Sequence, residues 1–340
     1  MSSTALVVTS IAAPNKCLQA LAEGCRREGY NFIVIGDAAS PSDFQLDGCN
    51  FYSLNDQLRL GFKFAHECPE RHYARKNLGY LIALRDGAHR IVETDDDNLP
   101  YPAFWTISAD GSPAPTVSGA GWINIFRYFS SANIWPRGFP LELVRQLPPD
   151  FESLGSAVND CPISHGLIDN DPDVDAIYRL TGNLPQMFTN NRRVALREGS
   201  WCPFGSQNTT WSAKTFALLY LPAYCSFRMT DIWRSFIAQR IAWANNWSVL
   251  FHEPTMYQER NTHNLMKDFR DEVPGYLHNA QLCSALEKLD LPAGEEQIPQ
   301  NLRTCYRQLV AMDLIDPKEL NLLDTWLDDL NSLRTGFDPT

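Results

Sequence analysis

The chain has 340 residues, 44% of them hydrophobic, and a formal net charge of −11 at pH 7. This size allows one large domain with an extension, or two domains. The acidic balance argues against a nucleic-acid partner, because nucleic-acid binders usually carry a basic face. No apolar run reaches the roughly 18 residues that a membrane-spanning helix needs.

Nine cysteines are scattered along the chain without a CxxC pair. The odd number and the irregular spacing argue against a zinc ribbon and against the disulfide framework of a secreted protein. The apolar N-terminus lacks a basic region and is soon followed by Pro14, so it predicts a strand and not a signal peptide. We expect a cytoplasmic protein without a transmembrane segment.

The first hundred residues alternate between strand-like and helix-like patterns. The predicted elements are strands over 5–11, 31–37, 50–54 and 89–94, and helices over 16–28 and 73–87. Since parallel strands are joined by crossover helices, this alternation predicts an open, doubly wound α/β sheet. Ligands of such sheets bind at the carboxyl ends of the strands.

The middle of the chain, from Pro100 to Pro203, is rich in Pro, Gly and Asn and predicts short strands over 115–118 and 175–180. Its long loops are expected to build the acceptor side of a site. A helix is predicted over 230–247, and amphipathic helices over 277–333.

These patterns suggest a division of the chain into two parts. Residues 1–270 form the main domain, with a nucleotide-binding half at 1–100 and an acceptor half at 101–270. Residues 271–340 form a C-terminal helical region.

Three consecutive aspartates, Asp95, Asp96 and Asp97, follow the predicted strand at 89–94. Carboxylates this close repel one another unless a cation lies among them. Strand alternation would turn Asp95 and Asp97 to one side. There they could hold Mn²⁺ or Mg²⁺, which prefer oxygen ligands and bridge to diphosphates. An acidic turn without function is the alternative, and Asn98 and Pro100 favour a turn.

One helix earlier lies the segment Arg75-Lys76-Asn77-Leu78-Gly79-Tyr80. Arg75 and Lys76 could supply positive charge to a diphosphate, and Asn77 a hydrogen bond to a base or ribose. A solvated helix N-terminus is the alternative, although positive charge there opposes the helix dipole. The arrangement resembles the GT-A glycosyltransferase superfamily, in which an Arg/Lys-Asn-Gly helix lies one strand before a DxD-type motif.

Further segments resemble, in order and spacing, the glycosyltransferase domain of the plant STELLO proteins, which has relatives in bacteria and animals. They are Val7–Ile11, Ile35–Asp37, Trp135–Gly138, Asp171–Asp175, Ser206–Thr209 and Asp231–Arg234. The resemblance implies a GT-A-like α/β fold, with a mixed Rossmann-like sheet flanked by helices and a C-terminal helical appendage. It also implies sugar transfer from a nucleotide-diphosphate sugar. UDP is favoured as the nucleotide because it is common among donors of the superfamily. The plant proteins are anchored in Golgi membranes, whereas no anchor is expected here.

The resemblance and the residue chemistry together assign candidate roles. The donor-binding candidates are Thr9, Ser10, Asp37, Arg75, Lys76, Asn77, Asp95 and Asp96. The metal-ligand candidates are Asp95, Asp97 and His252, with His165 as a further histidine. The acceptor-side candidates are Trp135, Arg137, Asp173, Asp175 and Arg234.

Asp231 is the candidate general base. It lies at the start of a predicted helix, with Thr230 as the expected N-cap, and helix capping alone would explain an aspartate there. Arg228 and Arg234 flank it and could bind phosphate or orient its carboxylate. A retaining transfer would need no such base.

Competing functions remain open at this point. A nucleotidyltransferase would carry a Gly-rich basic loop after the first strand, which Ile11-Ala-Ala-Pro-Asn15 lacks. A UDP-sugar mutase and an inactive sugar- or partner-binding module are compatible with the same residues. The expected partners are a nucleotide-sugar donor and a glycan or small hydroxyl acceptor, without nucleic acid. A homodimer is left open.

Overall fold

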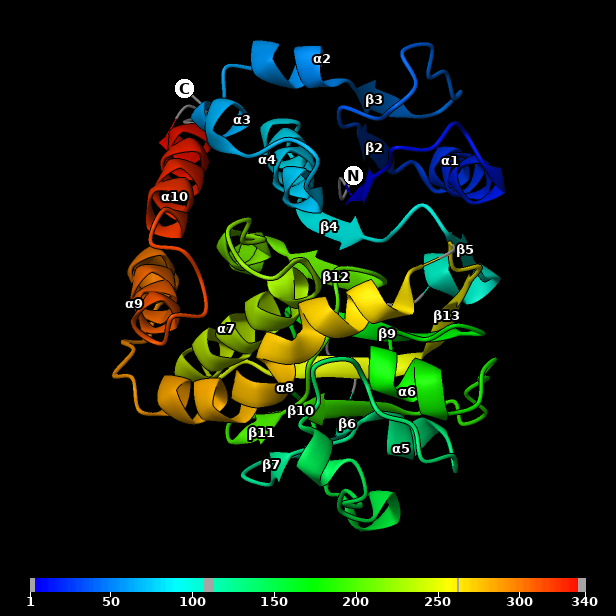
Figure 1. Ribbon diagram of the computed structural model, residues 1–340, viewed down its shortest axis with the longest axis vertical. Helices are drawn as coiled ribbons and strands as arrows, with labels where there is room; N and C mark the ends of the chain where they lie inside the picture. The colour runs from blue at the N-terminus through cyan, green and yellow to red at the C-terminus, as the bar shows by residue number, and fades with distance from the viewer. Residues whose placement is uncertain (1–3, 107–112, 262, 336–340) are drawn as a thin grey trace.

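The computed structural model describes residues 4–106, 113–261 and 263–335 of this mixed α/β protein (Figure 1). The strands are β1 (Thr4–Thr9), β2 (Asn31–Ile35), β3 (Asn50–Tyr52), β4 (Arg90–Glu93), β5 (Asn98–Pro100), β6 (Ala114–Val117), β7 (Gly121–Trp122), β8 (Ser156–Ala157), β9 (Ile163–Asp169), β10 (Arg193–Leu196), β11 (Ser200–Trp201), β12 (Thr209–Ser212) and β13 (Val249–Gln258).

Helices surround the strands. The α-helices are α1 (Lys16–Glu28), α2 (Leu54–Arg59), α3 (Lys63–Glu67), α4 (Lys76–Arg85), α5 (Phe126–Phe129), α6 (Ala176–Thr181), α7 (Thr230–Ala244), α8 (Leu265–Glu287), α9 (Ile298–Ala311) and α10 (Glu319–Thr335). The short 3₁₀ helices are η1 (Tyr73–Arg75), η2 (Pro102–Trp105), η3 (Leu141–Leu143), η4 (Phe151–Ser153), η5 (Ala213–Leu219), η6 (Phe227–Met229) and η7 (Glu295–Gln297).

An 11-stranded mixed sheet forms the centre, in the order β3-β2-β1-β4-β12-β9-β13-β10-β6-β8, with β5 paired to β13. The first four strands of this order are parallel, whereas β12 joins β4 antiparallel. Strand β1 lies between β2 and β4, so the chain changes its direction of travel across the sheet beside β1. Such a switch point opens a crevice at the carboxyl ends of the strands.

Helices cover both faces of this parallel region, as a doubly wound sheet requires. Leu6 and Val8 of β1 share a buried cluster with Leu18 of α1, whereas Val7 belongs to the cluster that contains Leu78 of α4. This is the alternation expected of a strand that is buried on both faces. The predicted α/β fold class is therefore confirmed.

Glycine at position 79 explains how closely α4 approaches the sheet. A Cβ atom there would lie 2.4 Å from Cγ1 of Val7 and 3.0 Å from Cγ1 of Ile35. Any larger residue would push the helix away from β1 and β2. The glycine of the Arg/Lys-Asn-Gly segment therefore sets the depth of α4.

Two local predictions are wrong. The segment 175–180 is not a strand, because Asp175 accepts a hydrogen bond from the backbone N–H of Tyr178 and starts α6. Thr230 is not an N-cap, because it is the first residue of α7, whose N-cap Met229 makes no side-chain hydrogen bond. Helices α2 and α3 were not predicted, since both are too short for a clear amphipathic pattern.

The last helix, α10, packs onto the first half of the chain, whereas α9 packs on α7 and α8. Figure 1 shows α9 and α10 along one side of the molecule, with α10 reaching α3. Asp329 accepts hydrogen bonds from the backbone N–H groups of Lys63 at 3.1 Å and Phe64 at 2.8 Å. Trp326 meets Phe64 edge to face, with ring centroids 6.0 Å apart. The helical region thus shares the core of the main domain.

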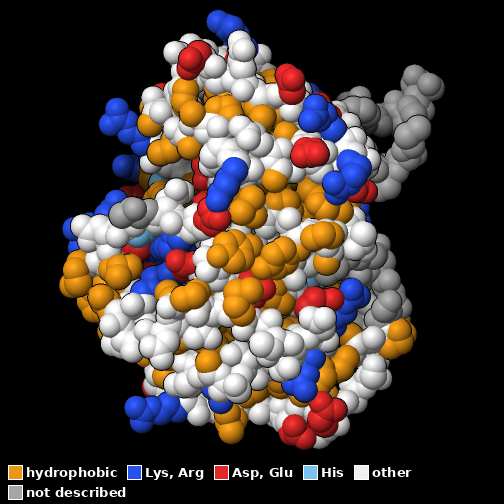
Figure 2. Space-filling model, turned by 90° about the vertical axis from the view of Figure 1, so that its right-hand side faces the viewer, with side chains coloured by type: hydrophobic (Ala, Val, Ile, Leu, Met, Phe, Trp, Pro, Cys, Tyr) orange, Lys and Arg blue, Asp and Glu red, His pale blue; other side chains and the backbone are white. Residues whose placement is uncertain are grey.

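Surface properties agree with the composition. Within residues 4–106, 113–261 and 263–335, no helix combines the length and the apolar character that crossing a membrane requires. Figure 2 shows charges of both signs interspersed with hydrophobic side chains on one face of the molecule.

The contact between α10 and α3 gives a stability prediction. Asp329→Ala should lower the free energy of unfolding by about 1–2 kcal/mol, because it leaves two helix N-terminal N–H groups without their acceptor. Urea unfolding measures this change. The matched control is Asp328→Ala, since Asp328 is exposed and forms a surface ion pair with the exposed Lys63 side chain. Equal effects of the two substitutions would contradict the capping role.

Candidate functional site

A cavity of about 610 Å³ opens at the carboxyl ends of β1, β2 and β4. It joins the first half of the chain to the segments around α7 and β13. The sequence-predicted residues that line it are Thr9, Ser10, Asp37, Arg75, Asp95, Asp96, Asp97, Arg137, Asp173 and Asp231. Lys76, Asn77, Trp135, Asp175, Arg234 and His252 are not part of its lining.

The three aspartates after β4 all border the cavity, each with a different partner. Asp95 is partly exposed and pairs with Nζ of Lys76 at 2.9 Å. Asp96 accepts a hydrogen bond from Ser10 Oγ. Asp97 accepts from Nε2 of Gln258 at 3.1 and 3.2 Å.

Burial makes negative charge costly in this turn. It raises the pKa of Asp96, and burial together with the neighbouring Asp95 raises the pKa of Asp97 to about 7. Crowded carboxylates of this kind are the oxygen ligands that Mg²⁺ and Mn²⁺ prefer. The donor set therefore fits a divalent cation. Among the residues that the structure describes, no group of three His, Cys, Asp or Glu side chains is arranged to hold a metal ion, so other oxygen ligands would have to complete the coordination.

Lys76 contacts the site from the protein interior and does not line the cavity. Its fully buried ammonium donates to the backbone oxygens of Thr94 (2.8 Å) and Ser206 (2.9 Å) as well as to Asp95. These contacts use its three N–H groups. Lys76 therefore orients Asp95 and does not reach into the cavity.

The flanking residues of the same segment are also held by protein partners. Arg75 donates to Gln57 Oε1 at 2.7 Å and to the backbone oxygen of Cys68 at 2.8 Å. Asn77 exchanges two hydrogen bonds with the backbone of Leu221, at 2.8 and 2.9 Å. The segment braces the walls of the cavity, and only Arg75 borders it.

Asp37, at the end of β2, orders the loop that leads to α4. Its carboxylate accepts from the backbone N–H groups of Arg71 and His72, both at 2.9 Å, and of Ala38 at 2.7 Å. This fixes the position of Tyr73, which forms part of the same wall.

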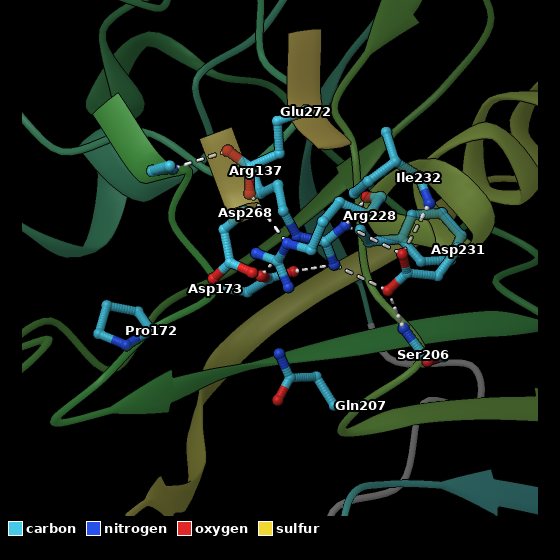
Figure 3. A network of polar contacts seen from close by, with 12 residues as sticks. Arg137, Pro172, Asp173, Ser206, Gln207, Arg228, Asp231, Ile232, Asp268 and Glu272 are labelled. Carbon is cyan, nitrogen blue, oxygen red and sulfur yellow. Dashed lines mark hydrogen bonds and ion pairs between the residues drawn. The ribbon is translucent and has the colours of Figure 1, made fainter. Parts of the chain in front are cut away.

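In another part of the same lining, Arg137 bridges two carboxylates (Figure 3). It donates to Asp173 at 2.8 and 2.9 Å and to Asp231 at 3.0 and 2.9 Å. Asp231 also accepts from the N–H of Ser206 and the hydroxyl of Tyr73. Burial alone would raise the pKa of Asp231, but Arg137 lowers it well below its usual range. Arg137 likewise overcomes burial and lowers the pKa of Asp173.

The predicted residues outside the cavity have structural partners. Trp135 donates to Asp175 at 2.7 Å, so both support α6. Arg234 forms a buried pair with Glu93 at 2.8 Å. His252 is buried, its Nδ1 lies 2.9 Å from the backbone oxygen of Glu253, and burial lowers its pKa to about 4.

Several lining residues escaped the sequence analysis, among them Tyr73, Gln207, Phe227, Gln258, Arg260 and His263. Tyr73, Phe227, Arg260 and His263 stand in loops or 3₁₀ turns, without a strand-end signal of their own. Gln258 ends β13 and meets Asp97 only through tertiary structure. Another lining residue, Arg228, was named in the sequence analysis, because it flanks Asp231 in the chain and could bind phosphate.

The Arg137 bridge predicts a pH-dependent stability effect. Arg137→Met should cost about 3–5 kcal/mol of unfolding free energy at pH 7, because it leaves two buried carboxylates without a counter-charge. The folded-state pKa values of Asp173 and Asp231 lie below the ordinary 3.8, so the wild-type contribution is present above that value and is lost as the pH falls. In the variant, burial raises both pKa values, and the cost is relieved as the pH falls through them. The deficit relative to wild type should therefore be smaller at pH 4 than at pH 7.

Urea unfolding at both pH values measures this deficit. Arg303→Met is the control, since Arg303 pairs with Asp324 at the surface. A deficit that is the same at pH 4 and pH 7 would argue against the bridge.

Comparison with solved structures gives only distant likenesses. A mycobacterial protein is 10% identical, with a TM-score of 0.40 over 82% of this chain and 75% of that one. Glucosyl-3-phosphoglycerate synthase of M. tuberculosis is 11% identical, with a TM-score of 0.40 over 82% of this chain and 81% of that one. TM-scores this low carry nothing about the site over to this chain.

Sequence comparison gives a more specific result. The family of STELLO glycosyltransferases matches residues 228–339. Two proteins of Arabidopsis thaliana, the probable glycosyltransferases STELLO1 and STELLO2, are each 26% identical over 272 residues, which is 74% of this chain. The chain spans only 35% of the length of these relatives. The resemblance indicated by its motifs is thus confirmed: the chain is similar in sequence to the STELLO glycosyltransferases.

Proposed function

We propose that this protein transfers a sugar from a nucleotide-diphosphate sugar to a hydroxyl group of a glycan or small acceptor. The observation that carries the proposal is one cavity with two chemically different walls. The aspartate turn stands at the switch point of the parallel strands, and the Arg137 bridge with Asp173 and Asp231 lines the same cavity. Such a cavity suits a diphosphate donor on one side and an acceptor on the other.

The donor is proposed to lie along the ends of β1 and β2. Thr9, Ser10 and Asp37 border that part of the cavity, where a nucleoside such as uridine would bind. Asp95 and Asp97 would hold Mn²⁺ or Mg²⁺, which would stabilise the charge that develops on the departing diphosphate. Ser10 keeps Asp96 turned toward β1, where it could accept from a donor hydroxyl.

Asp231 is the proposed base of an inverting transfer. In the structure its oxygens already accept from Arg137, Tyr73 and Ser206, and its lowered pKa makes it a weak base in this state. A base must reach the acceptor hydroxyl within hydrogen-bonding distance, so the acceptor would have to displace one of these donors. A retaining transfer would instead leave Asp231 as a binding group.

Nucleotide binding is the first test of the proposal. Calorimetric titration of UDP, GDP, CDP and dTDP should give micromolar binding of one nucleotide that depends on Mn²⁺. Asp95→Ala and Asp97→Ala should each weaken that binding about tenfold or more, a loss of at least about 1.4 kcal/mol. Asp47→Ala, at an exposed position, is the control and should bind like wild type.

If the protein binds none of these nucleotides, the proposed transferase function is contradicted and a binding module without this activity is favoured. If binding is seen but NMR shows ring contraction of UDP-arabinose without an acceptor, the protein is a UDP-sugar mutase instead.

The role of Asp231 is tested by kinetics once donor and acceptor are known. Asp231→Asn keeps the shape of the side chain but removes its basicity. For an inverting transfer it should lower kcat by about 10²–10⁴-fold and leave the affinity for the nucleotide unchanged. Asp173→Asn, which removes the same negative charge from the Arg137 bridge, controls for a general change of charge. A kcat close to wild type would exclude Asp231 as the base.

A further inference from the structure

Two arginines on the acceptor side of the cavity are only partly satisfied by the protein. Arg228, in η6, donates through Nε to Glu272 at 2.9 Å. Arg260, just after β13, donates through Nη2 to Asp268 at 3.3 Å. The same Nη2 lies 3.2 Å from Nδ1 of His263. All three basic side chains line the cavity.

Each guanidinium also carries a buried N–H group without an acceptor. Nη2 of Arg228 and Nε of Arg260 have no hydrogen-bond partner among the residues that the structure describes. A buried donor left in this state costs free energy that an acceptor atom would recover. A bound group with several oxygens would satisfy both of these donors at once.

The positive charges also act on one another. Burial, followed by the charges of Arg179 and Arg228, lowers the pKa of Arg260 to about 10. The arginine fork matches the geometry of phosphate and carboxylate oxygens. An anion at this wall would therefore offset the repulsion and accept the unpaired N–H groups together.

We propose that Arg228 and Arg260, with His263 beside them, form a subsite for an anionic group of the acceptor, a phosphate or a carboxylate. This inference rests on the proposed function and narrows its acceptor to negatively charged sugars or alcohols. It assigns to these side chains the recognition of the acceptor and not of the donor.

The surroundings of the two arginines favour the acceptor over the donor diphosphate. The charges that act on Arg260 belong to Arg179, Arg228, Asp171 and Asp173. Arg228 contacts the Arg137 bridge directly, because its backbone oxygen accepts a hydrogen bond from Arg137. The backbone before Arg260 is tied to Asp97 of the aspartate turn, so Arg260 joins this side through its side chain, which binds Asp268 of α8. Arg228 thus belongs to the wall of the Arg137 bridge, and Figure 3 shows it beside Arg137 and Asp268.

An aromatic ring at the same rim suits a sugar that carries the anion. Phe227, next to Arg228 in the chain, is 45% exposed and lines the cavity. Its ring meets that of Tyr73 edge to face, with centroids 4.8 Å apart. An exposed ring face held by a neighbouring ring can stack on a sugar, while the arginines bind its charged substituent.

Inorganic phosphate is the probe that tests the subsite. Titrated calorimetrically into protein saturated with UDP and Mn²⁺, it should bind with a measurable Kd. Arg260→Gln should raise that Kd about tenfold or more, and should leave the Kd for UDP within about twofold. Arg303→Gln, at the surface pair with Asp324, is the matched control and should change neither value. Thermal unfolding of each variant checks that it is folded.

A second arm uses substrates. Transfer from the identified donor to glucose 6-phosphate or glucuronate should exceed transfer to glucose at least tenfold in kcat/KM, and Arg228→Lys should reduce that preference. Lysine keeps the charge but loses the fork, so this variant remains informative even if a neutral residue at 228 does not fold.

Three results would overturn the subsite. They are competition between phosphate and UDP, an unchanged phosphate Kd in Arg260→Gln, and equal transfer to charged and neutral acceptors. Competition would assign the arginines to the donor diphosphate. By contrast, Arg260-dependent phosphate binding in a protein that binds no nucleotide would support the anion site and reject the proposed transferase, so the two failures are distinguishable.

Discussion

The buried ammonium of Lys76 is the contact on which the cavity depends. It joins α4 to the end of β4 through Thr94 and Asp95, and to the segment before β12 through Ser206. Because a buried charge is tolerated only when it is paired and hydrogen-bonded, these segments must stay together. The position of the aspartate turn therefore follows from the packing of α4, which the small residue Gly79 allows to lie close to the sheet.

A second buried ion pair supports the wall behind the cavity. Glu93, the last residue of β4, binds Arg234 of α7 and also accepts hydrogen bonds from Tyr80 and Trp211. This joins β4, β12, α4 and α7 in one network in the protein interior. A buried network that joins several elements restrains their positions, and such restraint holds site carboxylates at fixed distances. Asp95 and Asp231 each lie a few residues from a member of this network.

The pKa values of the carboxylates are shifted in opposite directions on the two sides of the cavity. Burial and mutual repulsion raise the pKa of Asp97, whereas Arg137 lowers the pKa of Asp231. A cation is therefore expected to be favoured at the first side. At the second, Arg137 compensates the carboxylates, while Arg228 and Arg260 retain unpaired N–H groups. This asymmetry is the basis on which we propose a metal-bound donor on one side and an anionic acceptor on the other.

Local patterns in the sequence determined the parallel half of the sheet, the extent of α1, and the aspartates at the end of β4. Those features depend on residues that are close in the chain: alternating apolar side chains, the Asn15 cap, and the Gly29 terminus with its positive φ of 72°. Tertiary structure decided the rest. Asp175 starts a helix and binds Trp135, and the basic segment 75–77 braces the walls. Gln258 and Arg260 join a cavity begun by β1, because contacts between residues so far apart in the chain arise only when the sheet assembles and buries their charges.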